Sequence, residues 1–388
     1  MKGIINKYGD PDAVVFSKTP DSYNLFWGFD DIFKINHDQL SNDNILNELQ
    51  NKINLWKESS DDIAAVGYFA YDAKQLFYPN VNFKKINLSL PIGWFGKPKI
   101  METVSRGEFH DFYSTSCKVK KSVDIMNQSK YNDKIDIIKK YLKDGDAYQI
   151  NFTQPIEYQY QGCSPIELFG SLSKFSKPNF GVYLNIDSHQ ILSLSPENFF
   201  SKKNNMISSS PIKGTRTRSN DINEDKKLMD ELENSQKDKA EHIMIVDLIR
   251  NDLGKICKFG TVETNNLFKV HSFKTIHHMI TDVIGELKEN ILEMDIFQAL
   301  FPGGSVTGAP KQRVLEIIDQ IEEYSRAIYT GSMGFISNTG DMNFNITIRT
   351  LTLNKEQGIY PVGGGIVWDS ISKDEREEAI HKSKILDI

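Results

Sequence analysis

The sequence has no long run of apolar residues and little cysteine. No window of about 18 apolar residues occurs, and the first residues show no apolar stretch followed by a small-residue cleavage site. We therefore expect no membrane-spanning helix and no secretory signal. The 3 cysteines, Cys117, Cys163 and Cys257, lie far apart in no metal-ligand spacing. This pattern favours structural thiols without disulfides, in a cytoplasmic protein.

An excess of basic residues is also missing. Lys and Arg number 46 against 52 Asp and Glu, which gives a net charge of -6. Such a chain has no overall positive field, so we expect neither nucleic acid nor a membrane surface as a partner. Any anion-binding site must be local.

The pattern of elements is mixed. The length of 388 residues allows two or three domains, yet no repeat and no low-complexity linker occurs. Strands and helices are interspersed without strict βαβ alternation, which predicts an α+β arrangement. In residues 1–120 we expect short strands and one helix at 43–58. Further helices are expected at 129–142, 165–173, 221–235, 237–250, 272–287, 291–300, 311–325 and 373–385. Strands are expected at 147–154, 180–186, 190–194 and 267–271 and, punctuated by glycine, up to Trp368.

Lys213 is the first candidate for chemistry. It lies two residues after Pro211, which fixes its own φ, and directly before Gly214, which tolerates strained dihedral angles. A lysine held in this way can be aimed into an anion-binding turn. A solvated lysine in a basic surface loop fits the same residues equally well.

Two pairs of acidic residues have helical spacing. Asp238 and Glu241 are three apart in one expected helix, and Glu375 and Glu378 are three apart in another. Each pair therefore projects from one helix face, and two such faces can form an oxygen-rich site for Mg²⁺. Taken alone, such pairs are more often solvated surface charge. Lys382, four residues after Glu378, is consistent with an intrahelical ion pair.

Glycine-rich turns are expected at 301–311, 329–331 and 362–365, where free backbone N–H groups can bind carboxylates. Arg349 ends a strand-like run, where its guanidinium can bind a carboxylate through two parallel hydrogen bonds. A surface arginine at a strand end is the equally plausible alternative.

Together these segments resemble the ordered motifs of the chorismate-utilising enzymes, which include the anthranilate, aminodeoxychorismate, isochorismate and salicylate synthases. The motifs are Ser-Pro-Glu at 195–197, Pro-Ile-Lys-Gly-Thr at 211–215, Glu-His-Ile-Met-Ile-Val-Asp-Leu-Ile-Arg-Asn-Asp-Leu-Gly at 241–254, Pro-Gly-Gly-Ser-Val-Thr-Gly-Ala-Pro-Lys at 302–311 and Gly-Gly-Gly-Ile-Val-Trp-Asp-Ser at 363–370. The resemblance implies one large α/β unit of two packed antiparallel sheets with helices outside. Residues 121–388 form its chorismate-binding catalytic region, and residues 1–120 are a weakly matched N-terminal part of the same unit.

Two positions distinguish the branches of this family. Members that add water to chorismate have a lysine as general base where this chain has Gln149, and an amide cannot accept a proton at neutral pH. Isochorismate and salicylate synthesis are therefore disfavoured. Anthranilate synthases resemble Pro-Ile-Ala-Gly-Thr at 211–215, whereas Lys213 matches the aminodeoxychorismate synthase branch. Component I of aminodeoxychorismate synthase is the leading interpretation, with anthranilate synthase component I as the alternative.

The resemblance also implies residue roles. Lys213 is the nucleophile, Glu197 the general acid, and His278 matches a histidine linked to pyruvate elimination in anthranilate synthases. Glu241 and Glu378 would bind Mg²⁺ directly, and Asp238 and Glu375 through metal-bound water. The expected substrate-binding residues are Thr215, Thr307, Gly308, Tyr329, Arg349, Gly363, Gly364, Gly365 and Lys382.

The expected partners follow from the nitrogen source. No cysteine lies in a nucleophile elbow with a matching histidine, so the sequence offers no glutamine-hydrolysing element. The expected substrates are chorismate and ammonia, and the expected protein partner is a glutamine amidotransferase subunit. A binding module without activity is a further possibility, disfavoured because Glu197, Lys213, Glu241 and Glu378 occur together.

Overall fold

Strands form the frame of the molecule. The computed structural model describes residues 1–84, 89–273, 276–355 and 357–387, and within these residues 18 strands are joined by hydrogen bonds. The strands are β1 (Ala13–Phe16), β2 (Ser22–Ile35), β3 (Ile63–Phe69), β4 (Gly93–Ser105), β5 (Lys118–Val123), β6 (Gln149–Gln161), β7 (Phe180–Ile186), β8 (His189–Ser195), β9 (Asn198–Lys203), β10 (Met206–Ser209), β11 (Ile212–Thr217), β12 (Glu263–Ser272), β13 (Ile276–Glu286), β14 (Gly308–Ala309), β15 (Ser332–Ser337), β16 (Met342–Ile346), β17 (Thr350–Asn354) and β18 (Gln357–Ile366).

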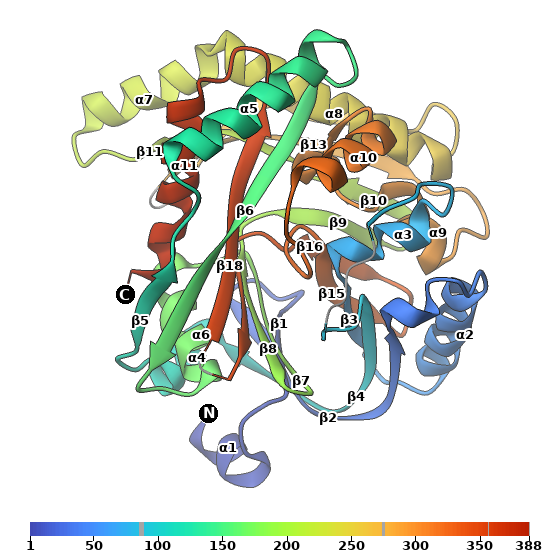
Figure 1. The fold of residues 1–388 in the computed structure, drawn as a ribbon. Coiled ribbons are helices and arrows are strands. Elements are labelled where there is room, and N and C mark those ends of the chain that lie inside the picture. The colour runs from blue at the N-terminus through green and yellow to red at the C-terminus, as the bar shows by residue number, and fades with distance from the viewer. Residues whose placement is uncertain (85–88, 274–275, 356, 388) are drawn as a thin grey trace.

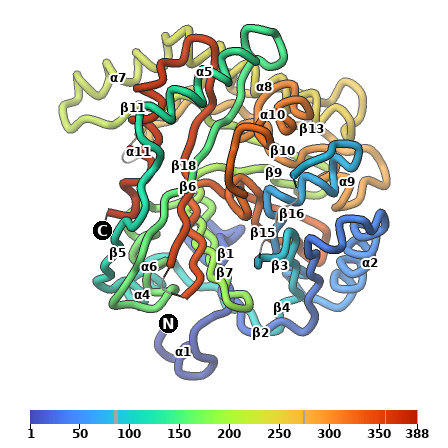
Figure 2. The backbone as a smooth tube through the Cα atoms, in the orientation of Figure 1, coloured from blue at the N-terminus to red at the C-terminus, as the bar shows by residue number. Residues whose placement is uncertain are grey.

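The pairings in the described part are all antiparallel. One half of the network runs from β13, which pairs with both β11 and β12, through β10, β9, β16, β15, β3 and β4 to β2. The other half runs from β1 through β7, β8, β17 and β18 to β6, which also pairs with β5 and β14. The two halves are joined where β1 pairs with β2. Figure 2 shows the blue N-terminal strand β3 beside the orange β15, far apart in sequence.

A buried cluster fills the space between the two halves. It combines Val15 and Val182 from β1 and β7 with Val66, Trp94 and Phe335 from β3, β4 and β15. The expected α/β fold of packed antiparallel sheets is confirmed. The β1–β2 pairing additionally connects the sheets at one edge.

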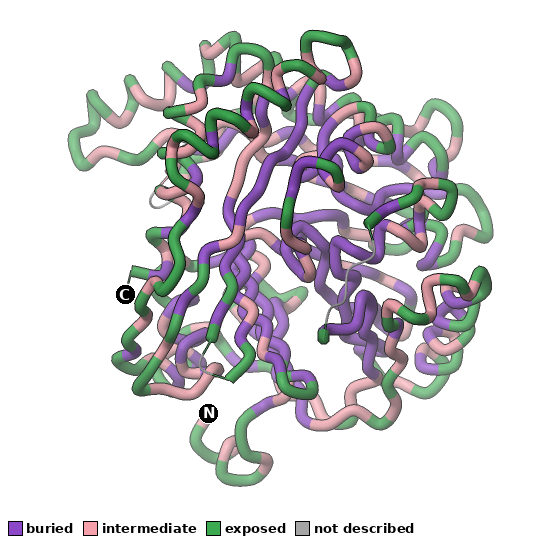
Figure 3. The backbone as a smooth tube through the Cα atoms, in the orientation of Figure 1, coloured by how far each residue is buried: buried purple, intermediate pink, exposed green. Residues whose placement is uncertain are grey.

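Helices cover the outer faces of these strands (Figure 1). They are α1 (Lys2–Tyr8), α2 (Ile45–Glu58), α3 (Lys74–Phe77), α4 (Arg106–Tyr113), α5 (Gln128–Lys143), α6 (Pro165–Ser176), α7 (Ile222–Asn234), α8 (Gln236–Ile256), α9 (Glu293–Leu300), α10 (Lys311–Ile321) and α11 (Ser372–Ser383). One outer core packs α2, α8 and α9 on the first half, and another packs α4 and α6 on the second. Figure 3 shows the resulting pattern of buried strands and outward-facing, exposed helix surfaces.

Local sequence explains several of these helices. The apolar stripe that predicted helix α2 comprised Ile45, Leu46, Leu49, Ile53, Leu55 and Trp56. Ile45, Leu49, Ile53 and Trp56 are buried at helical spacing, whereas Leu55 is exposed. At the start of α6 the side chain of Ser164 accepts a hydrogen bond from the backbone of Glu167, in a reciprocal capping box.

Four expectations about elements are wrong. The helix expected at 272–287 is instead strand β13, whose buried residues follow a two-residue alternation; residues 274 and 275 lie outside the described part. Helix α8 continues through Gly254 to Ile256. The expected turn at 362–365 lies in strand β18. Residues 1–120 also contain more than the one expected helix, since α1, α3 and α4 accompany α2.

The expectation of a chain without disulfides is wrong. Cys117 and Cys163 form a disulfide, while Cys257 is free and buried. The antiparallel pairing of β5 with β6 places Lys118 opposite Gln161, so the two cysteines flank one end of this pair. The distance between their positions in sequence concealed this proximity.

Among the described residues, no helix has the length and apolar character needed to cross a membrane.

Candidate active site

The candidate site lies where β11, α8, β18 and α11 come together (Figure 1). Helix α8 packs against β11, and α11 packs against β18. A Cβ atom built on Gly364 of β18 would lie 3.6 Å from Glu375 Oε2, 3.6 Å from Lys382 Nζ and 3.9 Å from Glu378 Oε1. The missing side chain at Gly364 therefore leaves room beside the charged groups of α11.

Glu197 follows β8 and is only 6% exposed. Its Oε1 atom accepts a hydrogen bond of 2.8 Å from the hydroxyl of Ser305. Burial raises the pKa of Glu197 to about 7, although Ser305 and the charge of Lys213 oppose this rise. A carboxyl group with this pKa is partly protonated at neutral pH and can act as a general acid.

Lys213 is part of β11, directly before Gly214, whose φ of +70° is left-handed. Burial lowers the pKa of Lys213, while the carboxylates of Glu241 and Glu197 oppose that change. Lys213 therefore lies among carboxylates in a partly buried position. A lowered pKa increases the fraction of neutral amine, the form that can act as a nucleophile.

The two expected acidic pairs approach each other from α8 and α11. Burial raises the pKa of Glu241, and the charges of Asp238 and Glu375 raise it further. Burial likewise raises the pKa of Glu375, with a further contribution from Glu378. The two helices therefore place like charges close enough to repel each other.

Lysines partly balance these charges. Lys382 Nζ lies 2.7 Å from Glu378 Oε1 and donates to the carbonyl oxygen of Gly363 at 2.8 Å. Its positive charge lowers the pKa of Glu378. Lys237 Nζ lies 3.9 Å from Glu241 Oε1. Lys382 thus connects α11 to the glycine segment of β18.

The oxygen donors fit a magnesium ion in chemical type. In the part of the chain that the structure describes, no group of three or more Asp, Glu, His or Cys side chains is arranged to hold a metal ion. Mg²⁺ commonly uses only one or two carboxylates, with water and substrate completing its coordination. Glu241 and Glu378 are carboxylates of this type, and both influence the pKa of Lys213.

Asp238 has a different partner from the expected one. Its Oδ2 atom forms an ion pair of 3.0 Å with Arg216, which follows the Lys213 turn on β11. Asp238 thereby connects α8 to β11 and lies within 3.1 Å of a Cβ atom built on Gly214. This ion pair supports the turn that holds Lys213.

His278 and Thr215 lie side by side on paired strands. The hydroxyl of Thr215 and Nδ1 of His278 are 2.9 Å apart. Burial lowers the pKa of His278 to about 4, with a smaller contribution from Arg349. The imidazole is therefore neutral near pH 7. Within the described residues its buried Nε2 has no hydrogen-bond partner, and the backbone of Gly214 opposes the lowering of the pKa.

Arg349 lies between β16 and β17 in a left-handed conformation, with φ of +51°. Its carbonyl oxygen accepts a hydrogen bond of 3.0 Å from the backbone of Leu194. The influence of Arg349 on the pKa of His278 places its positive charge near the imidazole.

Three glycines of β18 adjoin β6. Gly363, Gly364 and Gly365 lie opposite Thr153, Phe152 and Asn151. A Cβ atom on Gly365 would lie 2.8 Å from the amide nitrogen of Gln149, so only a glycine leaves room for this side chain. In the described part of the chain, neither polar atom of the buried Gln149 amide has a hydrogen-bond partner.

The turn at 301–311 is held against β6. Gly308 pairs with Ile150, and a Cβ atom on Gly308 would lie 2.0 Å from the Gln149 carbonyl oxygen. The Thr307 hydroxyl donates to the Gly303 carbonyl at 2.9 Å, inside the turn. Its side chain therefore shapes the turn, and Lys311 Nζ holds the far end through an ion pair of 2.6 Å with Asp252.

Tyr329 is 5% exposed and follows Arg326, whose carbonyl accepts its N–H at 2.9 Å. Burial raises the pKa of Tyr329, so its hydroxyl stays protonated and can donate a hydrogen bond.

The structure brings Glu197, Lys213, Glu241, Glu378 and Lys382 into one electrostatic group, since the other four charges all influence the pKa of Lys213. Sequence reasoning missed Ser305 and Arg326. Ser305 belongs to the motif at 302–311. Its place in that motif was the only sequence signal that could have identified it. Arg326 had no distinguishing local pattern.

Comparison with known proteins identifies the family of this chain. The sequence profile of the chorismate binding enzyme family matches residues 10–387. Aminodeoxychorismate synthase component 1 of Escherichia coli is 41% identical over 257 residues, which cover 66% of this chain and 56% of that protein. The chain thus spans little more than half the length of this relative. Anthranilate synthase component 1 of Saccharolobus solfataricus is 34% identical over 83% of this chain and 79% of its own length.

Solved structures show the same fold. Anthranilate synthase component I of Streptococcus pneumoniae superposes with a TM-score of 0.81 at 24% identity, covering 96% of this chain and 94% of that one. The menaquinone-specific isochorismate synthase of Escherichia coli gives a TM-score of 0.74 at 15% identity, with 97% and 88% coverage. Together with the profile match, these likenesses establish that the chain belongs to the chorismate binding enzyme family.

Proposed function

We propose that the chain is component I of an aminodeoxychorismate synthase, which converts chorismate and ammonia into 4-amino-4-deoxychorismate. The observation on which this proposal depends is the position of Lys213, in a partly buried setting that lowers its pKa, beside the protonatable Glu197. The 41% identity to the Escherichia coli aminodeoxychorismate synthase component 1 supports the same assignment.

The proposed reaction proceeds in two displacements. The neutral amine of Lys213 forms a bond to ring carbon 2 while both double bonds of the ring diene shift and the bond from carbon 4 to its hydroxyl breaks. Glu197 donates its proton to the departing hydroxide, which leaves as water. Ammonia then forms a bond to carbon 4, both double bonds shift back, and the bond between carbon 2 and the nitrogen of Lys213 breaks. The proton that the attacking ammonia loses balances the one that the departing lysine nitrogen gains, so Lys213 is released as an amine. The new amine is therefore para to the ring carboxylate.

The other residues bind and orient the substrate. Arg349 and Tyr329 offer a guanidinium and a phenolic hydroxyl to the carboxylates, and the backbone of residues 363–365 borders the same space. Glu241 and Glu378 would hold Mg²⁺, which when bound supplies positive charge to the ring carboxylate. Lys382 adds a fixed positive charge at this end of the site.

Ammonia requires a separate source, because the chain has no recognisable glutaminase nucleophile. We propose a glutamine amidotransferase subunit as the partner, consistent with the name component 1 of the relatives.

Anthranilate synthesis is the second candidate. The Saccharolobus solfataricus anthranilate synthase component 1 matches a larger share of this chain, 83%, than the Escherichia coli relative, 66%. In that reaction, ammonia attacks carbon 2 and pyruvate is lost, and Lys213 would serve only as a positive charge.

Product identification distinguishes the two. The purified chain is incubated with chorismate, Mg²⁺ and ammonium, and the products are analysed by mass spectrometry. We expect a product that keeps the enolpyruvyl group and forms p-aminobenzoate only after a separate lyase is added. Fluorescent anthranilate formed without the lyase would refute the proposal.

A further inference from the structure

Arg326 is a buried guanidinium that the proposed reaction does not use. It lies in the segment between α10 and β15 and is only 2% exposed. It donates hydrogen bonds to the Val306 carbonyl at 3.0 Å, to the Asn151 carbonyl at 2.6 Å and to the Thr330 hydroxyl at 3.2 Å. One side chain therefore connects its own segment, where Thr330 lies, to two other segments, at Val306 and at Asn151.

Each of these segments adjoins a proposed substrate contact. Val306 directly precedes Thr307, Asn151 of β6 pairs with Gly365 of β18, and Thr330 directly follows Tyr329. The Asn151 side chain strengthens the junction by donating to the Val306 carbonyl at 2.7 Å. The position of Arg326 thus sets the distances between the turn, the strand and the tyrosine.

Glu322 is the counter-ion that keeps Arg326 in place. Its Oε2 and Oε1 atoms accept from Nε and Nη2 of Arg326 at 2.8 and 2.7 Å. Glu322 Oε1 also accepts from the backbone and the hydroxyl of Thr153, each at 2.8 Å. The carboxylate therefore fixes the guanidinium relative to β6 as well.

Stability alone is a weak explanation for this pair. Removing two charges from water costs free energy that a buried ion pair only partly recovers, and well-packed apolar residues often do as well. A planar guanidinium, in contrast, offers five N–H donors in a fixed geometry. The arrangement suits the fixing of several backbone segments at once.

We propose that Arg326 is a positioning residue for chorismate binding, which holds the turn at 303–308, the start of β6 and Tyr329 at the spacing the substrate requires. It acts through these groups and does not touch the substrate. The proposal rests on the proposed use of chorismate, and it holds whether the product is aminodeoxychorismate or anthranilate.

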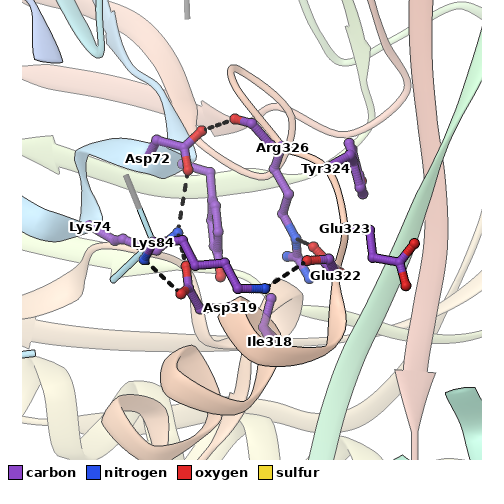
Figure 4. A pocket seen from close by; sticks show the side chains of 11 residues that line it. Asp72, Lys74, Lys84, Ile318, Asp319, Glu322, Glu323, Tyr324 and Arg326 are labelled. Carbon is purple, nitrogen blue, oxygen red and sulfur yellow. Dashed lines mark hydrogen bonds and ion pairs between the residues drawn. The ribbon is translucent and has the colours of Figure 1, made fainter. Parts of the chain in front are cut away.

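A neighbouring cavity makes the proposal testable by chemical rescue. The cavity has a volume of about 340 Å³, and Arg326 and Glu322 line it together with Tyr71, Lys84 and Tyr324 (Figure 4). Truncation of Arg326 to alanine would leave the Glu322 carboxylate bordering this cavity. A guanidinium ion from solution is small enough to occupy the vacated position.

The test compares Arg326→Ala with wild type by steady-state chorismate consumption, with and without millimolar guanidinium chloride. Loss of hydrogen bonds to a charged group should raise the KM for chorismate by about tenfold or more. Guanidinium should lower that KM again in a concentration-dependent manner, and sodium chloride at equal ionic strength should not. Arg326→Lys provides a second variant that keeps the charge, and it should show the same rise in KM because one ammonium cannot replace the planar fork.

Arg106→Ala is the matched control. Arg106 also bridges two backbone carbonyls, those of Pro178 and Asn179 at 2.8 and 2.9 Å, but it lies at the start of α4, away from β11 and α11 (Figure 1). Its KM for chorismate should equal that of wild type and should not respond to guanidinium.

An unchanged KM in folded Arg326→Lys would overturn the proposal. Guanidinium that raises the melting temperature of Arg326→Ala but leaves its KM high would also overturn it, because the role would then be structural. If wild type consumes chorismate but forms another product, the proposed function fails while the comparison of KM values still decides the role of Arg326.

Discussion

The hydroxyl of Ser305 offers a direct test of how Glu197 obtains its pKa. This hydroxyl donates to Glu197 Oε1 at 2.8 Å and is the largest of the influences that lower the pKa of Glu197. It stabilises the ionised carboxylate more than the neutral acid. Ser305→Ala should therefore raise the pKa of Glu197 above its present value of about 7.

The size of this change follows from the strength of the bond. A hydrogen bond to a charged group contributes about 1.5–3 kcal/mol, and one pKa unit corresponds to about 1.36 kcal/mol. The shift should thus be roughly 1–2 units upward. Because the reaction requires protonated Glu197, activity falls as pH rises through this pKa. The alkaline limb of kcat/KM should move to higher pH by the same amount.

The assay follows chorismate consumption with saturating ammonium and Mg²⁺ from mildly acidic to alkaline pH. Ser209→Ala is the control, since its hydroxyl is buried and donates to the Phe199 carbonyl at 2.7 Å, not to Glu197. Its profile should match wild type. If Ser305→Ala leaves the alkaline limb in place, or if Glu197→Gln retains that limb, Glu197 is not the proton donor.

Three further predictions concern the nucleophile, the metal and the nitrogen source. Lys213→Ala and Lys213→Arg should both lose most activity, because neither offers a neutral amine. Mass analysis of wild type given chorismate alone should show an adduct on the peptide that contains Lys213. The absence of an adduct, together with a fully active Lys213→Arg, would refute the covalent step. Glu241→Gln and Glu378→Gln should each weaken Mg²⁺ binding and lower the turnover rate, while the protein remains folded. Full activity of either variant in excess EDTA would exclude the proposed metal role. The purified chain should use ammonium but not glutamine until an amidotransferase subunit is added, and glutamine-driven turnover by the chain alone would contradict this.

Periodic patterns predicted much of the fold. The apolar stripe within residues 45–56 predicted α2, and four of its residues are buried. The run at 180–186 matches β7. The prediction for residues 272–287 was wrong because Ile276, Met279, Ile280, Val283 and Ile284 have the spacing of one helix face. Pairing with β10, β11 and β12 decided the outcome, and pairing is not visible in a local window.

The candidate site was predictable to the extent that its residues lie in compact motifs. Two motifs identified Glu197 and Lys213 as candidates: Ser-Pro-Glu at 195–197 and Pro-Ile-Lys-Gly-Thr at 211–215. In the structure each of these two residues influences the pKa of the other. The ion pair of Asp238 with Arg216 was not predictable, because it depends on the packing of α8 on β11. Arg326 was missed for the same reason, since the carbonyl groups of Val306 and Asn151 that accept its hydrogen bonds meet it only after folding.

Glu197 and Lys213 illustrate how one environment can prepare both reactants. Burial disfavours charge, so it raises the pKa of the carboxyl and lowers the pKa of the amine. Their mutual attraction works in the opposite direction, because it favours the ion pair, yet burial is the larger influence on each group. Both pKa values therefore move toward neutrality from opposite sides. The proposed first displacement needs a neutral amine to attack and a neutral acid to protonate the leaving hydroxide in the same step. A more hydrated site would hold the two groups as ammonium and carboxylate, and neither would be in its reactive form.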